Sequence, residues 1–347
     1  MAAAPNAFAP LAAITRGGLE ESWHLGAVAV VEPGGGLIAR AGDPRLETFV
    51  RSAAKPWQAL PLVLAGGIER YQLDEADLAL VCASHSGTPA QAARVARLLE
   101  RGGFGVEALQ CGVHPPFDEA AAEALRRRGE PASALHNNCS GKHAGMLLAC
   151  ALLGLSSDDY LDPSHPLQRR VVELVGAFCR VAPAEIGIGI DGCSAPTPRL
   201  SLHAAAIGYA ALAAPEEASP GADERRAAAA VARAMTRAPE MVAGPGRFTT
   251  RLMQVTAGRI LGKEGAEGFY AAAVLGPAPL GVAIKVADGG ERCRDGVVLD
   301  VLRQIGSLSA AEFEELRTFH RPVLQNRRGL RVGEVVPDVE LESGPMA

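Results

Sequence analysis

Arg51-Ser-Ala-Ala-Lys-Pro56 is the stretch from which we interpret the chain, because it sets a hydroxyl and an amine three residues apart. Residues at i and i+3 share one face of a helix, so a helix that starts near Ser52 would bring the Lys55 amine toward the Ser52 hydroxyl. A serine becomes a strong nucleophile when a neighbouring base takes its proton, and a neutral amine can act as that base. The motif is short, so a catalytic interpretation needs support from elsewhere in the chain.

The composition predicts a compact protein that acts on a small molecule. The chain has 347 residues, of which 48% are hydrophobic, and a net charge of -5. Because no linker or charge block divides it, we expect one domain over residues 10–335, with a sheet lobe from 20–50 and 260–335, a helical lobe from 52–258, and a tail over 336–347. Charges of both signs are interspersed, which argues against nucleic acid and membrane partners.

The cysteines and the N-terminus indicate a cytoplasmic location. Seven cysteines, an odd number, are spread from Cys82 to Cys293, unlike the dense framework of a secreted disulfide protein. Residues 1–14 are apolar, but they contain prolines and lack the basic n-region of a signal peptide, so they do not resemble one. No run of residues is long and apolar enough to span a bilayer.

The pattern along the chain predicts strands near both ends and helices between them. Val- and Ala-rich residues 24–32, a Pro-Gly turn and residues 37–41 are typical of a hairpin. A helix is expected to follow Thr88 and Pro89 and to end near Gly102, and another to run from Asp118 to Arg128. Further helices are expected over 146–153, 167–179, 200–213, 223–236 and 293–305, and strands over 186–190, 269–275, 280–286 and 330–335.

Three polar stretches are candidates for a site. Ser84 lies in Ala83-Ser-His-Ser-Gly just before a predicted helix, although turn and capping bonds would also explain these residues. His136-Asn-Asn-Cys-Ser-Gly-Lys-His-Ala-Gly-Met146 is the densest polar cluster and precedes an apolar helix, which favours a site wall over a capped loop. Asp191 directly follows a short predicted strand, which makes it a candidate site carboxylate. The Gly-Ile-Gly-Ile-Asp-Gly run there is followed by Pro196, which counts against a nucleotide-binding loop that opens a helix, so we expect no nucleotide cofactor.

The order of these parts resembles that of the serine β-lactamases and glutaminases. The resemblance implies an α/β fold in which N- and C-terminal strands form an antiparallel sheet flanked by helices, with a helical middle section. The motifs go further, since Arg51-Ser-Ala-Ala-Lys-Pro, Ala83-Ser-His-Ser-Gly, the 136–146 block and Asp191-Gly-Cys resemble the L-asparaginase II family, the rhizobial-type class 3 enzymes. This resemblance spans roughly residues 10 to 335.

The family resemblance implies the reaction and the residues that carry it. It implies hydrolysis of L-asparagine by a homodimer, with two Ser-Lys pairs brought into one pocket, Ser52 with Lys55 and Ser84 with Lys263. It implies that Arg51, Asn138, Asp191 and His143 bind substrate and that Cys139, Lys142 and Cys193 hold Zn²⁺. Spacing alone would make both cysteines buried core thiols.

The sequence departs from the family pattern at two positions, and it leaves several alternative functions open. Leu25 follows His24 where a basic residue is expected, and Ser194 follows Cys193 where glycine is expected. A glutaminase would use the same chemistry on a side chain one methylene longer, which changes binding by only about 1 to 3 kcal/mol. A β-lactam-reactive enzyme and a catalytically silent protein that binds zinc or an amino acid are further alternatives.

Overall fold

The computed structural model describes residues 7–344 and divides into two compact units. Unit 1 comprises Met1–Ala53, Leu200–Ala218 and Arg251–Ala347, and unit 2 comprises Ala54–Arg199 and Ser219–Thr250. Residues 345–347 of the predicted tail lie outside the described part.

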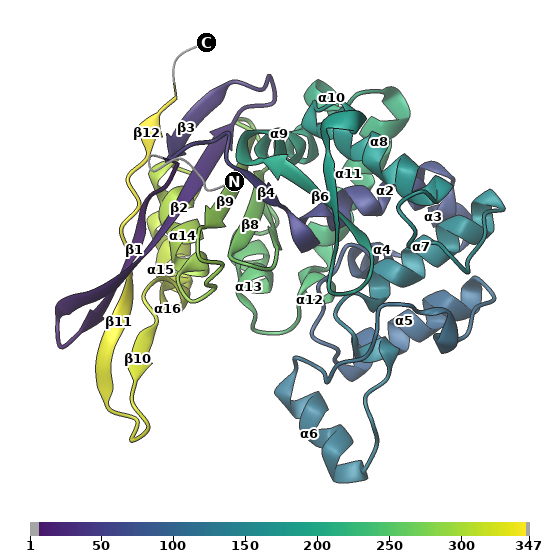
Figure 1. Ribbon diagram of the computed structural model, residues 1–347, viewed down its shortest axis with the longest axis horizontal. Coiled ribbons are helices and arrows are strands. Elements are labelled where there is room, and N and C mark those ends of the chain that lie inside the picture. The colour runs from purple at the N-terminus through teal and green to yellow at the C-terminus, as the bar shows by residue number, and fades with distance from the viewer. Residues whose placement is uncertain (1–6, 345–347) are drawn as a thin grey trace. The chain divides into compact units, whose positions relative to one another are not determined.

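Unit 1 is built on a nine-stranded antiparallel sheet. Its strands are β1 (Ala9–Arg16), β2 (Leu19–Val31), β3 (Leu37–Ala41), β7 (Ile260–Glu264), β8 (Phe269–Val274), β9 (Leu280–Val286), β10 (Val323–Gln325), β11 (Arg331–Pro337) and β12 (Glu342–Ser343). The main order is β10-β11-β1-β2-β9-β8-β7, so the N-terminal strands β1 and β2 lie side by side between strands from the later part of the chain (Figure 1). The predicted fold class, a mixed α/β fold with a sheet from N- and C-terminal strands, is confirmed.

Helix α9 (Leu202–Ala213) packs on this sheet against β2, β8 and β9. All its residues except His203 are buried, and most are alanine, glycine or leucine, which lets the helix approach closely. A Cβ at Gly281 of β9 would lie 1.9 Å from the Ala206 carbonyl oxygen, so this contact requires glycine. The remaining elements of unit 1 are the short strand β4 (Glu47–Phe49), the 3-10 helix η1 (Arg51–Ala54, at the boundary between the units), α10 (Pro215–Ala218), α14 (Arg294–Gln304), α15 (Ala310–Glu315) and α16 (Arg317–His320).

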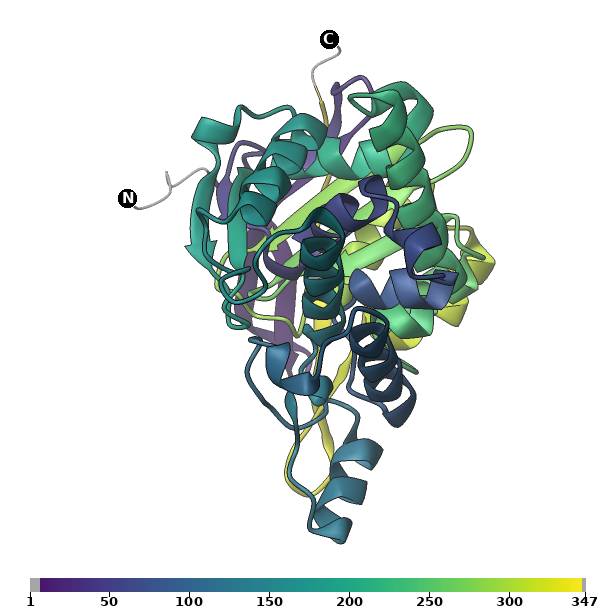
Figure 2. The ribbon, with the colours of Figure 1, turned by 90° about the vertical axis from the view of Figure 1, so that its right-hand side faces the viewer.

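Unit 2 is mainly helical and gathers around α7 (Ser140–Leu153), whose first eleven residues are all buried. Its other helices are α1 (Lys55–Gln58), α2 (Leu60–Leu64), α3 (Gly67–Arg70), α4 (Glu75–Val81), α5 (Pro89–Arg101), α6 (Glu119–Arg128), α8 (Pro166–Cys179), α11 (Ala222–Arg237), α12 (Pro239–Val242), and the 3-10 helices η2 (Val106–Ala108), η3 (Ala134–His136) and η4 (Pro183–Glu185). Helices α1 to α5 and α8 contact α7 (Figures 1 and 2). Strand β5 (Gly187–Ile190) pairs with β6 (Pro196–Ser201), which, like α13 (Phe248–Val255), crosses the boundary between the units.

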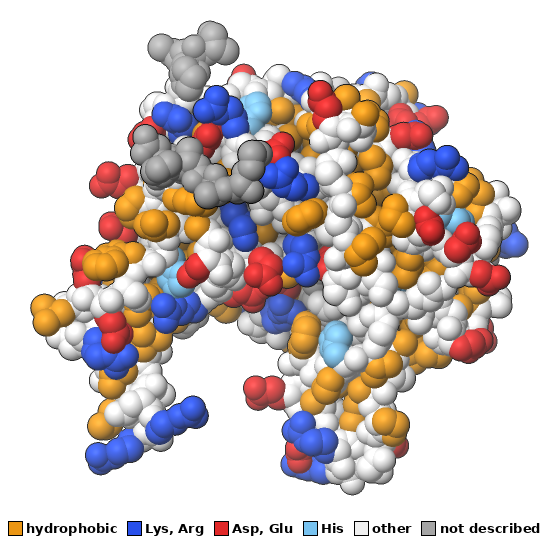
Figure 3. Space-filling model, in the orientation of Figure 1, with side chains coloured by type: hydrophobic (Ala, Val, Ile, Leu, Met, Phe, Trp, Pro, Cys, Tyr) orange, Lys and Arg blue, Asp and Glu red, His pale blue; other side chains and the backbone are white. Residues whose placement is uncertain are grey.

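Local signals placed several of these elements correctly. The Thr88 hydroxyl accepts from the Gln91 N–H and caps α5, and Asp118 caps α6, which ends at the left-handed Gly129. One prediction was wrong, because α7 begins at Ser140 rather than Met146 and so contains most of the polar cluster. No helix among the described residues has the length and apolar character needed to cross a membrane. Acidic and basic side chains are interspersed on the face shown in Figure 3.

Candidate active site

The polar residues of unit 2 are positioned by a glycine contact between α4 and α7. Gly141 and Gly145 lie one turn apart on α7, and a Cβ at Gly141 would stand 2.2 Å from the Leu80 carbonyl oxygen of α4. The two helices therefore approach until backbone meets backbone. Because α4 ends at Val81, this contact brings the segment that carries Ser84 toward the start of α7.

Lys55 and Ser84 form a buried pair within unit 2. The Lys55 Nζ donates to the Ser84 Oγ at 2.9 Å and to the Ala83 carbonyl oxygen at 2.5 Å. The two residues are 1% and 3% exposed. Ser84 itself is held through its backbone, since its N–H donates to the Val242 carbonyl and its carbonyl accepts from Arg247. A hydroxyl and an amine in hydrogen-bonding contact away from water are the parts of an activated nucleophile.

Cys139, Lys142 and Cys193 lie together next to this pair. The Lys142 Nζ is 2.9 Å from the Cys193 Sγ, and all three side chains are buried. A hydrogen bond from Cys193, followed by the charges of Lys55 and Lys142, lowers the pKa of Cys139 against the opposing effect of burial. The pKa of Lys142 is raised, because the charges of the two cysteines outweigh its burial. The cluster thus favours one thiolate, on Cys139, beside a lysine cation.

Asn138 and Asp191, both predicted to bind substrate, border this cluster. Asn138 donates its backbone N–H to the His114 Nε2 at 3.0 Å, and its Oδ1 is 3.3 Å from the Cys139 Sγ. The Asp191 charge is among the causes that raise the pKa of Lys142. Asp191 also accepts from the N–H of Gly192 and begins the turn that carries Cys193.

His143 is fully buried on α7 and leaves one ring nitrogen without a protein partner among the described residues. Its Nδ1 lies 2.7 Å from the Tyr160 hydroxyl oxygen, which accepts from the Gln110 N–H at 3.1 Å. The other ring nitrogen, Nε2, is the atom without a partner among the described residues. Burial, then the charge of Lys142, lowers the pKa of His143, so the ring is neutral.

Three predicted residues, Arg51, Ser52 and Lys263, belong to unit 1. Ser52 lies in η1, and Arg51 before it has a left-handed backbone with φ of 51°, which is uncommon for a residue with a side chain. Lys263 is buried on β7 and donates its Nζ to the Glu264 carbonyl oxygen at 2.9 Å. The turn after β7 packs on the segment before η1, since a Cβ at Gly265 would meet the Val50 carbonyl oxygen at 2.7 Å.

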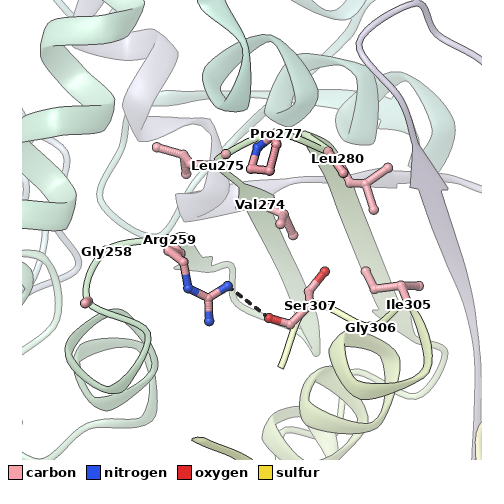
Figure 4. Close-up of a pocket in the computed structure, with 12 residues that line it drawn as sticks. Gly258, Arg259, Val274, Leu275, Pro277, Leu280, Ile305, Gly306 and Ser307 are labelled. Carbon is pink, nitrogen blue, oxygen red and sulfur yellow. Dashed lines mark hydrogen bonds between the residues drawn. The ribbon is translucent and has the colours of Figure 1, made fainter. Parts of the chain in front are cut away.

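A separate hollow of unit 1, of about 440 Å³, contains none of the predicted residues (Figure 4). It lies between the β8–β9 turn and the end of α14, and its walls include Val274, Leu280 and Ile305. Arg259 is the charged residue of its lining, and its guanidinium donates to the Ser307 carbonyl oxygen. The hollow therefore offers no nucleophile paired with a base.

The family of the chain follows from a comparison with protein families. The L-asparaginase II model matches residues 12–337, which is nearly the whole chain and includes every predicted site residue. The chain belongs to the L-asparaginase II family. This membership makes it an amidohydrolase. A separate search of curated proteins found no match.

Solved structures that this family member resembles are distant in sequence. They include Mglu in its native form (TM-score 0.44, 16% identity, 82% of this chain and 65% of Mglu). They also include a β-lactamase from Mycobacterium bovis (TM-score 0.43, 17% identity, 80% of this chain and 94% of that one). A Bacillus glutaminase matches with a TM-score of 0.39 and 16% identity over 82% of this chain and 91% of its own.

The donor atoms of Cys139, Lys142 and Cys193 are of the types that zinc prefers. Zinc prefers thiolate sulfur and nitrogen, and Cys139, Lys142 and Cys193 supply two sulfurs and an amine that are all buried. In a tetrahedral site sulfur and nitrogen ligands stand about 3.5 Å apart, so the 2.9 Å between Lys142 and Cys193 has to widen. Residues 7–344 contain no group of three His, Cys, Asp or Glu side chains able to hold a metal, so the lysine would have to serve, after losing a proton.

Sequence reasoning did not assign a role to four residues that touch the site. Their contacts are non-local: His85 with Ser140, His114 with Asn138, Tyr160 with His143, and Arg247 with the Ser84 carbonyl. His85 lies inside a motif that the sequence did single out, so its position gave a signal. The other three lie in loops or elements with no distinctive pattern.

Proposed function

We propose that this family member hydrolyses L-asparagine to L-aspartate and ammonia through an acyl-enzyme on a lysine-activated serine. The observation that supports this most directly is the buried contact of 2.9 Å between the Lys55 Nζ and the Ser84 Oγ. Family membership supplies the reaction class, and this contact supplies a base and a nucleophile.

The reaction proceeds in two balanced halves. Lys55 reacts in its neutral form, after its ammonium group has given a proton to water. The serine oxygen attacks the side-chain carboxamide carbon while its proton passes to this neutral amine, and the amine then gives that proton to the departing ammonia. Water attacks the resulting ester, its proton passes to the amine, and the amine returns a proton to the serine oxygen as aspartate leaves. The lysine thus ends each half as it began.

The family resemblance assigns the attack to Ser52 with Lys55 and a proton relay to Ser84 with Lys263. The observed contact gives Ser84 a base of its own, so the two serines are rival nucleophiles. Arg51, Asn138, Asp191 and His143 are proposed to hold the charged α-groups of the substrate. Cys139, Lys142 and Cys193 would hold Zn²⁺, which would supply positive charge for orienting the substrate, and no step above depends on it. The homodimer remains a prediction that light scattering can check.

Ammonia release from asparagine and glutamine tests the proposal. The wild type is compared with Ser52→Ala, Ser84→Ala and Lys55→Met, and Ser86→Ala is the matched control, because that buried hydroxyl of the same segment donates to the Ala243 carbonyl and contacts no lysine in this structure. We expect Lys55→Met to lower kcat by about 100-fold or more, as loss of a general base does. The serine whose loss abolishes turnover is the nucleophile. Near-normal turnover by Lys55→Met would refute the proposal, and faster turnover of glutamine would change the substrate.

A further inference from the structure

His85 is a fully buried histidine whose two ring nitrogens and backbone N–H are all hydrogen-bonded. Its Nδ1 accepts from the Gly87 N–H at 3.1 Å, and its Nε2 lies 2.9 Å from the Ser140 Oγ. Its backbone N–H donates to the Asn138 carbonyl at 3.1 Å. These three contacts lie within unit 2.

The direction of these bonds fixes one tautomer of the His85 ring. A backbone N–H can only donate, so Nδ1 carries no proton. The Ser140 hydroxyl donates to the Leu135 carbonyl at 2.9 Å, so its oxygen is left to accept from the Nε2–H. Burial, then the charge of Lys55, lowers the pKa of His85 to about 3. The ring is therefore neutral in neutral solution, and both of its polar atoms are engaged.

His85 joins the two segments that carry the site of unit 2. It directly follows Ser84, whose hydroxyl contacts Lys55, and its partners Asn138 and Ser140 flank Cys139. The His85 ring thus links the segment that carries Ser84 to the segment that carries Cys139.

We propose that His85 is a positioning residue of the amide-hydrolysing site, and that its ring bonds to Gly87 and Ser140 hold the Ser84 hydroxyl in register with Lys55. The inference rests on the proposed function of this same site. The ring acts through Ser84 and exchanges no proton with substrate, because its donor and its acceptor are already used. A shift of about 1 Å in a reacting group can lower the rate by about 100-fold, so a rigid link of this kind matters for the rate.

Kinetics of His85→Leu, His85→Gln and Ser140→Ala test the proposal. We expect His85→Leu to lower kcat on asparagine by about 100-fold with KM changed by less than about threefold. His85→Gln, which keeps an N–H donor and an acceptor, is expected to recover at least about tenfold of that loss, and Ser140→Ala to fall between the two. The pH–rate profiles of the variants should keep the wild-type shape, since the ring does not titrate in the assay range.

The matched control is His165→Gln. His165 is another buried histidine of unit 2, and its Nδ1 accepts from the Leu167 N–H at the start of α8. We expect this variant to keep the wild-type kcat even if it loses as much thermal stability as His85→Gln. An unchanged kcat in His85→Leu, losses of kcat equal to those of His165→Gln, or disappearance of one limb of the pH–rate profile would each overturn the inference.

Hydrogen exchange tests the link without any activity. Removing the Ser140 hydroxyl should release the His85 ring and speed exchange of the Gly87 amide, while the Ser84 amide, which donates to the Val242 carbonyl, keeps its wild-type rate. If the wild type releases no ammonia from either amide, the proposed function fails, and this measurement still decides the link. An unchanged Gly87 exchange rate in Ser140→Ala would refute it.

Discussion

Replacing Gly141 by alanine is predicted to damage activity far more than stability. Gly141 is the point at which α7 approaches the backbone of α4, and the added Cβ would stand 2.2 Å from the Leu80 carbonyl oxygen. An ordinary contact between carbon and a carbonyl oxygen is about 3.3 Å, so the helices must separate by about 1.1 Å. The atom in the way belongs to the backbone and cannot turn aside.

The two effects of this substitution can be given magnitudes. Overpacking costs about 1 to 3 kcal/mol, and alanine returns about 1 kcal/mol of helix propensity, so the free energy of unfolding should fall by no more than about 2 kcal/mol. Ser84 follows the end of α4 by three residues, so a shift of about 1 Å reaches the Lys55–Ser84 contact. A misplacement of that size lowers kcat by about 100-fold.

Two further glycines serve as graded controls. A Cβ at Gly145 would lie 2.4 Å from the Val81 side chain, and that side chain can change rotamer. Gly145→Ala should therefore lose less kcat and less free energy of unfolding than Gly141→Ala. A Cβ at Gly192 meets nothing within 4 Å, so Gly192→Ala should unfold at the wild-type urea concentration. Urea unfolding and ammonia release are measured on all three. Wild-type kcat in Gly141→Ala, or equal losses in the three variants, would refute the role of the helix contact.

Other predictions concern acid stability, backbone strain and the buried tyrosine. Because the pKa of His85 is depressed to about 3, the unfolded chain binds more protons than the folded chain once the pH is below the ordinary histidine pKa of about 6.5, so stability falls as pH drops from there toward 3, by up to about 5 kcal/mol from this residue. Urea unfolding of His85→Leu between about pH 7 and 4 should show a flatter decline, and an equally steep one would contradict this. Ser194 has a left-handed φ of 68°, so Ser194→Gly should raise the free energy of unfolding by about 0.5 kcal/mol in urea, whereas a decrease would argue against strain. Tyr160→Phe should lower it by about 1 to 3 kcal/mol in the same assay, because the Gln110 N–H and the His143 Nδ1 lose their partner, and an unchanged value would mean that these groups find another.

The parts of the fold that depend on local chemistry could be predicted from the sequence. The capping residues Thr88 and Asp118 gave two helix starts correctly, and the Pro-Gly turn gave β3 with its observed bounds. Strand β1 was not predicted. It pairs with β2, its neighbour in the chain, and also with β11, more than three hundred residues along the chain, so only part of its support is local. The helix was predicted to begin at Met146, so the start of α7 from Ser140 was missed. Its polar residues form a helix there because Gly141 allows α4 to cover them.

The sequence indicated candidate site residues, but it did not indicate which of them contact one another. Motif spacing suggested Ser52 with Lys55, since the two lie three residues apart. The observed partner of the Lys55 amine in unit 2, Ser84, lies 29 residues away, and no periodicity indicates that contact. The glycine expected in place of Ser194 has a simple physical reason, because that position has a positive φ.

The position of Cys139 explains why the thiolate of its cluster falls on this residue rather than on Cys193. Cys139 is the N-cap of α7, where the first N–H groups of the helix point outward and the helix dipole is positive. Such a position lowers the pKa of a cysteine, and nearby cations add to the effect. Lys55 and Lys142 supply those cations, and the pKa of Cys193 is correspondingly raised, chiefly by its hydrogen bond with Cys139 and by burial. The start of α7 thus stabilises an anion beside the Lys55–Ser84 pair, and zinc binding there would have to displace fewer protons than binding by two neutral thiols.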